Sequence, residues 1–470
     1  MQTIIYILPE IFLSLTIMFL LMIGVFVKKS FKLVSLLTIF SLVFSMALVI
    51  NQAGKITKVF NNSYIIDELS IFMKVLTLLF GAFVLLTSKD YIRTNKIDKI
   101  EYPIIILGST LGMILMISSY DLIVFYLGLE LQSLCLYILA SFKKEDEKST
   151  EAGLKYFILS ALASGILLYG CSLLYGFTGS TNFDEISVNL NESNPGAIFG
   201  IVFIIIGLAF KISVVPFHMW TPDVYEGSPT SVTSFFAIVP KIAALTVFIR
   251  FMYVPFINII DQWQTILIFL SIGSMILGAV AAIGQNNIKR LMAYSSIGHM
   301  GYALAGLATG IITGIQSSII YLTIYLVMNI GAFACIFLMK RENIYYENIY
   351  ELSGMSKNHP MLALSFIIIL FSLAGIPPLA GFFAKFYIFM AVIESKLYTL
   401  AVIGLLTTVI SAFYYLRIVK IIYFDKPKKS FEENYDWGLK IPLILATILI
   451  LVYFIYPSAL INVVNTIKIY

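Results

Sequence analysis

Long apolar runs separated by short polar segments fill almost the whole chain. A membrane-spanning helix needs about 20 mainly apolar residues, and about fourteen runs approach that length. The run at 360–394 is long and interrupted by prolines, so we count it as one broken span. Because lipid-exposed loops and sheet edges cannot cross hydrocarbon, the pattern predicts an all-helical (all-α), polytopic membrane protein. The predicted spans are 4–27, 31–50, 67–88, 101–119, 121–142, 151–178, 196–220, 228–253, 263–284, 289–308, 314–340, 360–394, 397–424 and 438–457.

The composition fits a protein that is solvated by lipid. Hydrophobic residues make up 60% of the 470 residues and charged residues 12%, against roughly a quarter charged in soluble domains. The three cysteines, Cys135, Cys171 and Cys335, lie far apart in apolar runs, and the sequence has no Cys/His cluster, P-loop or dinucleotide-binding glycine motif. We therefore expect no cofactor, metal or nucleic-acid site in this chain, and any redox cofactor on other chains.

Lysines and arginines gather in alternate loops. Six of the seven odd-numbered loops carry them, whereas the sixth loop, 178–195, has none. Positively charged loops face the cytoplasm, so an even number of spans predicts that both termini lie on the outer (periplasmic) side of a bacterial inner membrane. The odd loops carry Lys28, Lys29, Lys32, Lys89, Arg93, Lys96, Lys99, Lys143, Lys144, Lys148, Lys289, Arg290, Lys340, Arg341, Lys357, Lys420, Lys426, Lys428 and Lys429.

Two spans share a proline break with a lysine beside it. Lys211 precedes Pro216, and Lys385 follows the pair Pro377–Pro378, five spans later. An odd offset inverts the topology, so we expect two inverted five-helix repeats, of the kind that place transport sites at broken helices. The expected division is three N-terminal helices (1–100), two repeats (101–253 and 254–424) and a C-terminal helix (425–470).

Four ionisable residues lie deep inside predicted spans. Glu130 is nine residues past Asp121, about 14 Å into its helix, where a charge costs roughly 2.5–3.5 kcal/mol. Lys241 is twelve residues past Pro229, about 18 Å along its helix, too deep to reach the interface easily. Lys211 and Lys385 lie beside the helix breaks, where freed backbone groups or water can solvate an ammonium. We expect proton-carrying roles for all four, with Lys211 as a natural partner for Glu130.

Three further candidates are open to two interpretations. Lys155 lies near the start of its span, so it either modulates the buried charges or reaches the cytoplasmic interface. His218 and His299 can relay protons because the imidazole pKa is near neutral, although a packing role explains His299 equally well. Lys74 is open in the same way as Lys155, and we expect Arg250 at the outer interface. Glu10 faces either a partner or the outer interface, and its role is open.

Five strings resemble subunit N of bacterial respiratory complex I, the NADH-quinone oxidoreductase. They are GLELQSLCLYILASF (128–142), EAGLKYFILSALASGILLYG (151–170), KISVVPFHMWTPDVYEGSPTSVTSFFA (211–237), KRLMAYSSIGHMGYALAG (289–306) and LAGIPPLAGFFAKFYIF (373–389). The resemblance covers about 100–420 and implies an antiporter-like fold of fourteen helices, with helices 7 and 12 broken.

The resemblance also implies roles and partners. Glu130 and Lys211 would form the inner charged pair, Lys241 the central proton carrier, Lys385 the carrier of the second half-channel and Lys155 a modulating lysine. NADH, FMN, iron–sulfur clusters and quinone are expected on partner subunits, among neighbouring antiporter-like and small membrane subunits in the lipid bilayer.

Other functions are compatible with the same residues. The chain could belong to a multi-subunit Na⁺/H⁺ antiporter or a related membrane-bound hydrogenase, which share the broken helices and lysines. It could also be a membrane scaffold that moves no ion, or a small-solute transporter, although the sequence shows no polar cluster apart from the ion path.

Overall fold

The structure, a computed structural model, describes residues 2–27, 30–190, 194–432 and 436–468. Lys28 and Lys29, assigned above to a cytoplasmic loop, lie outside these ranges. Two short antiparallel hairpins occur, one formed by β1 (Thr57–Val59) and β2 (Tyr64–Ile66) and the other by β3 (Lys340–Arg341) and β4 (Ile344–Tyr345).

Helices make up nearly all of the remaining regular structure. In chain order they are η1 (Gln2–Ile7), α1 (Leu8–Phe26), α2 (Phe31–Ile50), α3 (Glu68–Thr94), α4 (Glu101–Ile117), α5 (Leu122–Ala140), α6 (Glu147–Thr178), α7 (Phe183–Asn189), α8 (Pro195–Ile212), α9 (Trp220–Gly227), α10 (Thr230–Tyr253), η2 (Ile257–Ile259), α11 (Ile260–Ile283), α12 (Ile288–Leu307), α13 (Ile312–Phe337), η3 (Ile349–Leu352), α14 (Met355–Asn358), α15 (Pro360–Ala374), α16 (Ala380–Glu394), α17 (Tyr398–Phe424), α18 (Trp437–Ile455) and α19 (Ser458–Asn465).

The all-helical membrane fold predicted from the apolar runs is confirmed. Each of the predicted ranges contains a helix. Within the described ranges, eleven helices are long and apolar enough to cross a membrane, and α4 and α15 are shorter apolar helices. The predicted span count of about fourteen stays a prediction, because several helices in that count are short or interrupted.

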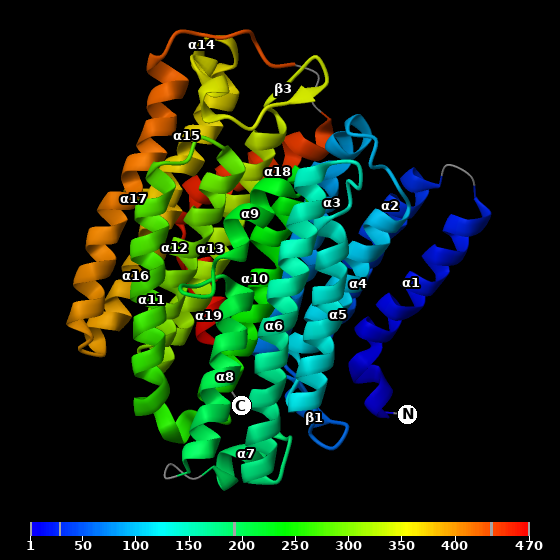
Figure 1. The fold of residues 1–470 in the computed structure, drawn as a ribbon, viewed down its shortest axis with the longest axis vertical. Helices are drawn as coiled ribbons and strands as arrows, with labels where there is room; N and C mark the ends of the chain where they lie inside the picture. The colour runs from blue at the N-terminus through cyan, green and yellow to red at the C-terminus, as the bar shows by residue number, and fades with distance from the viewer. Residues whose placement is uncertain (1, 28–29, 191–193, 433–435, 469–470) are drawn as a thin grey trace.

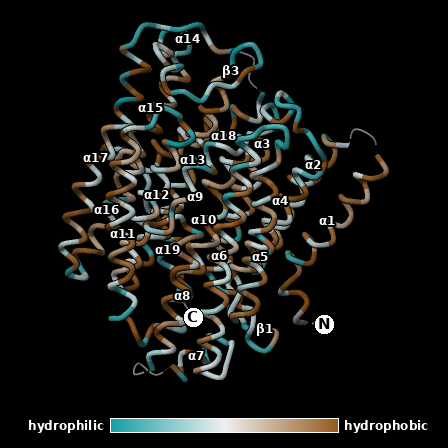
Figure 2. The backbone as a smooth tube through the Cα atoms, in the orientation of Figure 1, coloured by the Kyte–Doolittle hydropathy of each residue, from teal (hydrophilic) through white to brown (hydrophobic). Residues whose placement is uncertain are grey.

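The helices run side by side, as expected for a bundle that spans a bilayer (Figure 1). Hydrophobic residues fill the middle of the bundle, and hydrophilic residues are concentrated towards its ends (Figure 2). Both chain ends lie towards the end of the bundle that carries β1 and α7, and the β3 hairpin and α14 lie at the opposite end. The bundle thus has the apolar waist and polar caps that a membrane requires.

The centre of the bundle is α10. It packs against α3, α8 and α13, and its whole apolar window is buried, whereas α1 and α18 remain largely exposed at the perimeter. Pro240 does not interrupt α10. Lys241 on this helix is therefore enclosed by protein on every side, away from both lipid and bulk water.

The polar cap beside α14 is held by ion pairs between loops. Glu351, in η3, accepts from Arg341 at 2.5 Å and from Lys428 at 2.7 Å. The Lys428 contact, together with that of Arg341, outweighs partial burial and holds the pKa of Glu351 below its usual range. Glu351 therefore stays ionised at neutral pH and ties the segment after α17 to the loop after α13.

Two buried ion pairs correct the sequence-based expectation for Arg250 and decide the position of Lys74, which the sequence left open. Arg250 does not reach the interface: it is buried and donates to both Asp67 oxygens, at 2.6 and 2.9 Å. Lys74 is also buried, and its ammonium lies 2.6 Å from Glu10 and 2.6 Å from the Tyr64 hydroxyl. The carboxylates come from other helices and distant loops, which explains why the sequence of one helix did not reveal these pairs.

We expect Arg250→Met to destabilise the protein by about 3–5 kcal/mol, because it leaves the Asp67 carboxylate buried without a cation. The double variant Arg250→Met/Asp67→Ser should recover most of the loss, since serine can also cap the N-terminus of α3. Thermal unfolding of the detergent-solubilised protein measures both. Unfolding of Arg250→Met at the wild-type temperature would contradict this account of the pair.

Candidate functional site

Both proline breaks have the same local architecture. Helix α8 ends at Ile212 and is followed by Ser213 in the left-handed region (φ 65°), and α15 ends at Ala374 and is followed by Gly375 (φ 87°). Each break continues to prolines, which cannot extend a helix. The last carbonyl groups of both helices therefore point into the bundle without the partners that a continuing helix would supply.

Lys241 binds the end of the first broken helix. Its ammonium donates to the carbonyl oxygen of Ile212 at 2.9 Å and to the hydroxyl of Ser213 at 2.7 Å. Its side chain is buried, and no carboxylate within the described part of the chain lies within ion-pair distance. The negative end of the helix dipole thus takes the place of a counter-charge.

Lys385 repeats this arrangement at the second break. Its ammonium donates to the carbonyl oxygen of Ala374 at 2.9 Å and lies 3.4 Å from that of Leu373. The ring of Tyr302 is 5.1 Å from the ammonium, close enough for a cation–π contact. The predicted position of Lys385 at the junction of two half-helices is confirmed by these contacts.

Lys211 is held by two hydroxyl groups and not by Glu130. Its ammonium donates to Ser133 and to Ser160, each at 2.7 Å. One carboxylate oxygen of Glu130 is buried without a hydrogen-bond partner. The direct Glu130–Lys211 contact expected from the sequence is therefore not made in this structure, because serines on α5 and α6 take the ammonium instead.

The two histidines have different surroundings. His299 on α12 contacts the hydroxyls of Tyr321 at 2.6 Å and Tyr415 at 3.2 Å, and Tyr415 also bonds Ser295 at 2.5 Å. This row of exchangeable protons joins α12, α13 and α17. His218 lies in the turn between α8 and α9, where its Nδ1 is buried and unpartnered.

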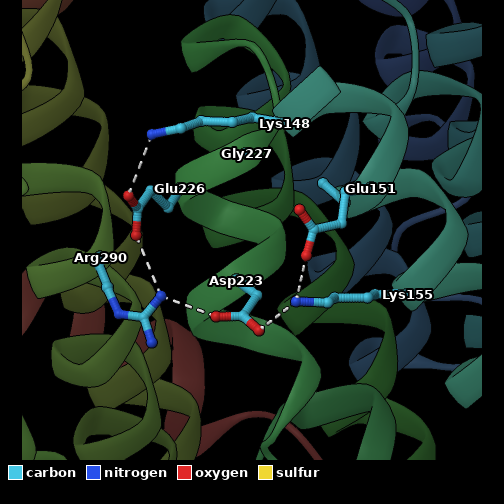
Figure 3. A pocket seen from close by; sticks show the side chains of 8 residues that line it. Lys148, Glu151, Lys155, Asp223, Glu226, Gly227 and Arg290 are labelled. Carbon is cyan, nitrogen blue, oxygen red and sulfur yellow. Dashed lines mark hydrogen bonds and ion pairs between the residues drawn. The ribbon is translucent and has the colours of Figure 1, made fainter. Parts of the chain in front are cut away.

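Lys155 lies at the surface of the bundle. Its side chain is 42% exposed and pairs with Glu151 at 2.6 Å and Asp223 at 3.0 Å. Figure 3 shows these groups in a pocket of about 180 Å³ that also contains Lys148, Glu226 and Arg290. Of the two interpretations left open by the sequence, the geometry favours the interfacial one.

Several groups in the site were missed by sequence reasoning. Ser213 and Gly375 shape the breaks, and Ser133 and Ser160 hold Lys211. Hydroxyl residues are common in membrane helices, so their presence alone carries little information. A small residue three positions before Pro216 and two before Pro377 was the available signal for the breaks, because a left-handed residue often ends a helix.

The chain is similar to known membrane proteins along nearly its whole length. Residues 119–411 match the family described as "NADH:quinone oxidoreductase/Mrp antiporter, TM". NADH-quinone oxidoreductase subunit N of Pelagibacter ubique is 64% identical, with 99% of each chain covered. The same subunit of Parvibaculum lavamentivorans is 52% identical, with 97% of this chain and 95% of that protein covered.

Solved structures with the same fold include chains of two different assemblies. A chain of respiratory complex I from Thermus thermophilus matches with a TM-score of 0.84 and 30% identity, covering 97% of this chain and 98% of that chain. A chain of the Mrp complex from Dietzia matches with a TM-score of 0.86, covering 97% of this chain and 96% of that chain, but at 20% identity this likeness shows the fold alone.

We expect Gly375→Ala to destabilise the protein by about 1–2 kcal/mol. In the left-handed region the Cβ atom of an L-residue lies too close to the following carbonyl oxygen. The new methyl group would also lie 3.0 Å from the Lys385 side chain. Gly176→Ala, in α6 with open space around it, is the matched control and should be neutral or stabilising. Equal unfolding temperatures for the two variants would refute the assigned strain.

Proposed function

Since the chain belongs to the subunit N family of NADH-quinone oxidoreductase, we propose that its buried Glu and Lys side chains carry the protons that this enzyme moves. The chain is a membrane subunit of the H⁺-translocating complex I and works beside other membrane subunits. NADH, FMN, iron–sulfur clusters and quinone belong to partner subunits, so the contribution of this chain is proton transfer coupled to their chemistry.

The observation that carries the proposal is how Lys241 and Lys385 are held. At the helix breaks, Lys241 is bound by a carbonyl and a hydroxyl group and Lys385 by two carbonyl groups, and neither is bound by a carboxylate of the described residues. A buried carboxylate would hold the proton on the lysine, because loss of that proton would leave the negative charge of the carboxylate uncompensated. Carbonyl dipoles stabilise the ammonium less strongly, so the lysine can release its proton and take up another.

The proposed sequence of transfers starts at Lys211. When Lys211 leaves Ser133 and Ser160 for Glu130, the charge next to the first break changes. Lys241 then takes a proton from the cytoplasmic side and passes it through water and the His299–Tyr415 row to Lys385, which releases it outside. His218, with its free buried nitrogen beside the first break, is a further relay group.

The proposed topology divides the chain into helices 1–100, repeats 101–253 and 254–424, and a final helix in 425–470. The shared architecture of the two breaks supports the repeat. We place both termini on the outer side of the bacterial inner membrane. In support, both chain ends lie towards the end of the bundle that carries α7 (Figure 1). Helix α7 belongs to the loop 178–195, which has no Lys or Arg and is therefore expected on the outer side.

Rival functions differ in what supports them. A subunit of an Na⁺/H⁺ antiporter would have the same fold, but the high identities are to subunit N of NADH-quinone oxidoreductase. A membrane scaffold would need no buried lysine held at a helix break. A solute transporter would need a polar pocket inside the bundle, and the polar pocket beside Lys155 opens at its surface.

We expect Lys241→Met to lower proton translocation by at least about tenfold, because a positioned proton-transfer group contributes at least 10²-fold. Lys420→Met, on the exposed face of α17 with a 68% exposed side chain, is the control and should pump normally. Both are measured in inside-out membrane vesicles driven by NADH, together with quinone reduction. Unchanged pumping and unchanged quinone reduction in Lys241→Met would remove this lysine from the path.

The topology has its own test. A protease-cleavable tag after Tyr470 should be cut in intact spheroplasts, where only the outer side of the membrane is accessible, and protected in inside-out vesicles. The reverse pattern would invert the proposed orientation but would leave the proton-carrying residues unaffected.

A further inference from the structure

Six charged side chains form one continuous row at the pocket beside Lys155 (Figure 3). Three cations alternate with three carboxylates, so the row is electrically balanced. The helices that contribute are α6, α9 and α12. The contacts in order are Lys148–Glu226 at 3.7 Å, Glu226–Arg290 at 3.1 Å, Arg290–Asp223 at 2.8 Å, Asp223–Lys155 at 3.0 Å and Lys155–Glu151 at 2.6 Å.

Asp223 is the centre of this row. One of its carboxylate oxygens binds Lys155 on α6 and the other binds Arg290 on α12. Asp223 lies on α9, the short second half of the first broken helix, which is eight residues long. Asp223 therefore ties this short helix to both of its charged neighbours at 2.8 and 3.0 Å, and Glu226 adds a longer contact to each of the same two helices.

An aromatic pair adjoins the row in sequence, since Tyr156 follows Lys155 and Trp220 lies three residues before Asp223. Trp220, the first residue of α9, stacks on Tyr156 of α6 at 4.3 Å with an interplanar angle of 8°. Its indole N–H donates to the carbonyl oxygen of Phe210 at 3.1 Å, and its ring lies 6.0 Å from the Lys241 ammonium. Both aromatic side chains are buried. Helix α9 therefore places an apolar ring next to the Lys241 ammonium.

Along α6, residues of the pocket, of the aromatic stack and of the Lys211 site follow one another. Lys155 lines the pocket, Tyr156 follows it in the stack, and Ser160, one turn deeper, holds Lys211. The stacked Tyr156–Trp220 pair therefore lies next to both the pocket-lining residues and the surroundings of Lys211 and Lys241.

We propose that α9 is the gate for proton entry, with the Tyr156–Trp220 stack as the barrier and Asp223 as the positioning residue that holds it closed. The inference rests on the proposed function, in which this pocket faces the cytoplasm. Movement of α9 away from α6 separates the two rings and admits water to Lys211 and Lys241.

The exposure of the ion pairs suits a gate. The side chains of Lys155, Asp223 and Arg290 are between 30% and 42% exposed, and partly exposed pairs are weak and exchange easily with water. The Arg250–Asp67 pair, by contrast, is fully buried and acts as a permanent tie. Contacts that open at low cost are those that a repeatedly moving helix needs.

The test measures access to the space below the barrier. Ser164 is buried on α6, one turn beyond Ser160, and its hydroxyl has no partner, so Ser164→Cys is a mild reporter. The three native cysteines are replaced by alanine, and the assembled complex is labelled in membrane vesicles with a charged, membrane-impermeant methanethiosulfonate reagent. The labelling rate of the introduced thiol is compared between variants, with complex assembly checked by NADH–ferricyanide activity.

We expect Asp223→Asn and Arg290→Gln to raise the labelling rate about fivefold, which corresponds to about 1 kcal/mol in an opening equilibrium. Trp220→Ala should raise it as well, because it removes the barrier with the ion pairs intact. The conservative variants Asp223→Glu, Arg290→Lys and Trp220→Phe should stay near the background rate. Glu342→Gln, which breaks the surface pair with Lys429, is the control for charge loss elsewhere and should also stay there.

Two results would overturn the gate. One is a background labelling rate in both Asp223→Asn and Trp220→Ala, and the other is an equal rise in Glu342→Gln, which would indicate general loosening. The labelling does not depend on pumping, so the gate can fail while Lys241 stays in the path, or the reverse. Labelling from the outer side only would refute the orientation and not the barrier.

Discussion

A lysine ammonium inside a membrane protein needs a partner, and the choice of partner decides what the lysine can do. In this chain the two central lysines are bound by carbonyl groups at helix ends that are exposed by a break in the helix. The breaks are tolerated because they lie inside the bundle, where lipid does not reach the irregular backbone. The position of α10 at the centre, the left-handed residues at the breaks and the neighbouring prolines all serve this one arrangement.

The buried ion pairs of the same protein show the alternative. Arg250 is bound to Asp67, and Lys74 to Glu10, by charged partners in protein interior. Such pairs cost too much to separate easily. The Arg250–Asp67 pair joins α10 to the start of α3, and the Lys74–Glu10 pair joins α3 to α1. The fold therefore holds helices together with carboxylates, whereas the two lysines of the proposed proton path are bound by backbone carbonyl and hydroxyl groups.

The contacts of Lys211 and of the pocket beside Lys155 are intermediate between the carbonyl-bound lysines and the buried ion pairs. Lys211 is bound by two hydroxyls that can donate or accept, so it can exchange partners without leaving a charge unpaired. The row of charges around Asp223 is exposed to water, which lets its pairs open. Along the proposed path from the pocket inward, the groups that solvate a proton change from water to hydroxyl groups and then to backbone carbonyls, so the proton would move in steps.

From the sequence we could predict the membrane fold, the approximate ranges of the helices, the two breaks and the depth of the four ionisable residues. These features follow from hydropathy, proline chemistry and helix rise, which act along a single segment of chain. Only the tertiary structure decided the partners: Ser133 and Ser160 for Lys211, helix ends for Lys241 and Lys385, and carboxylates for Lys74 and Arg250. Each of these contacts joins residues from different parts of the chain, and which residues meet depends on how the helices pack around α10.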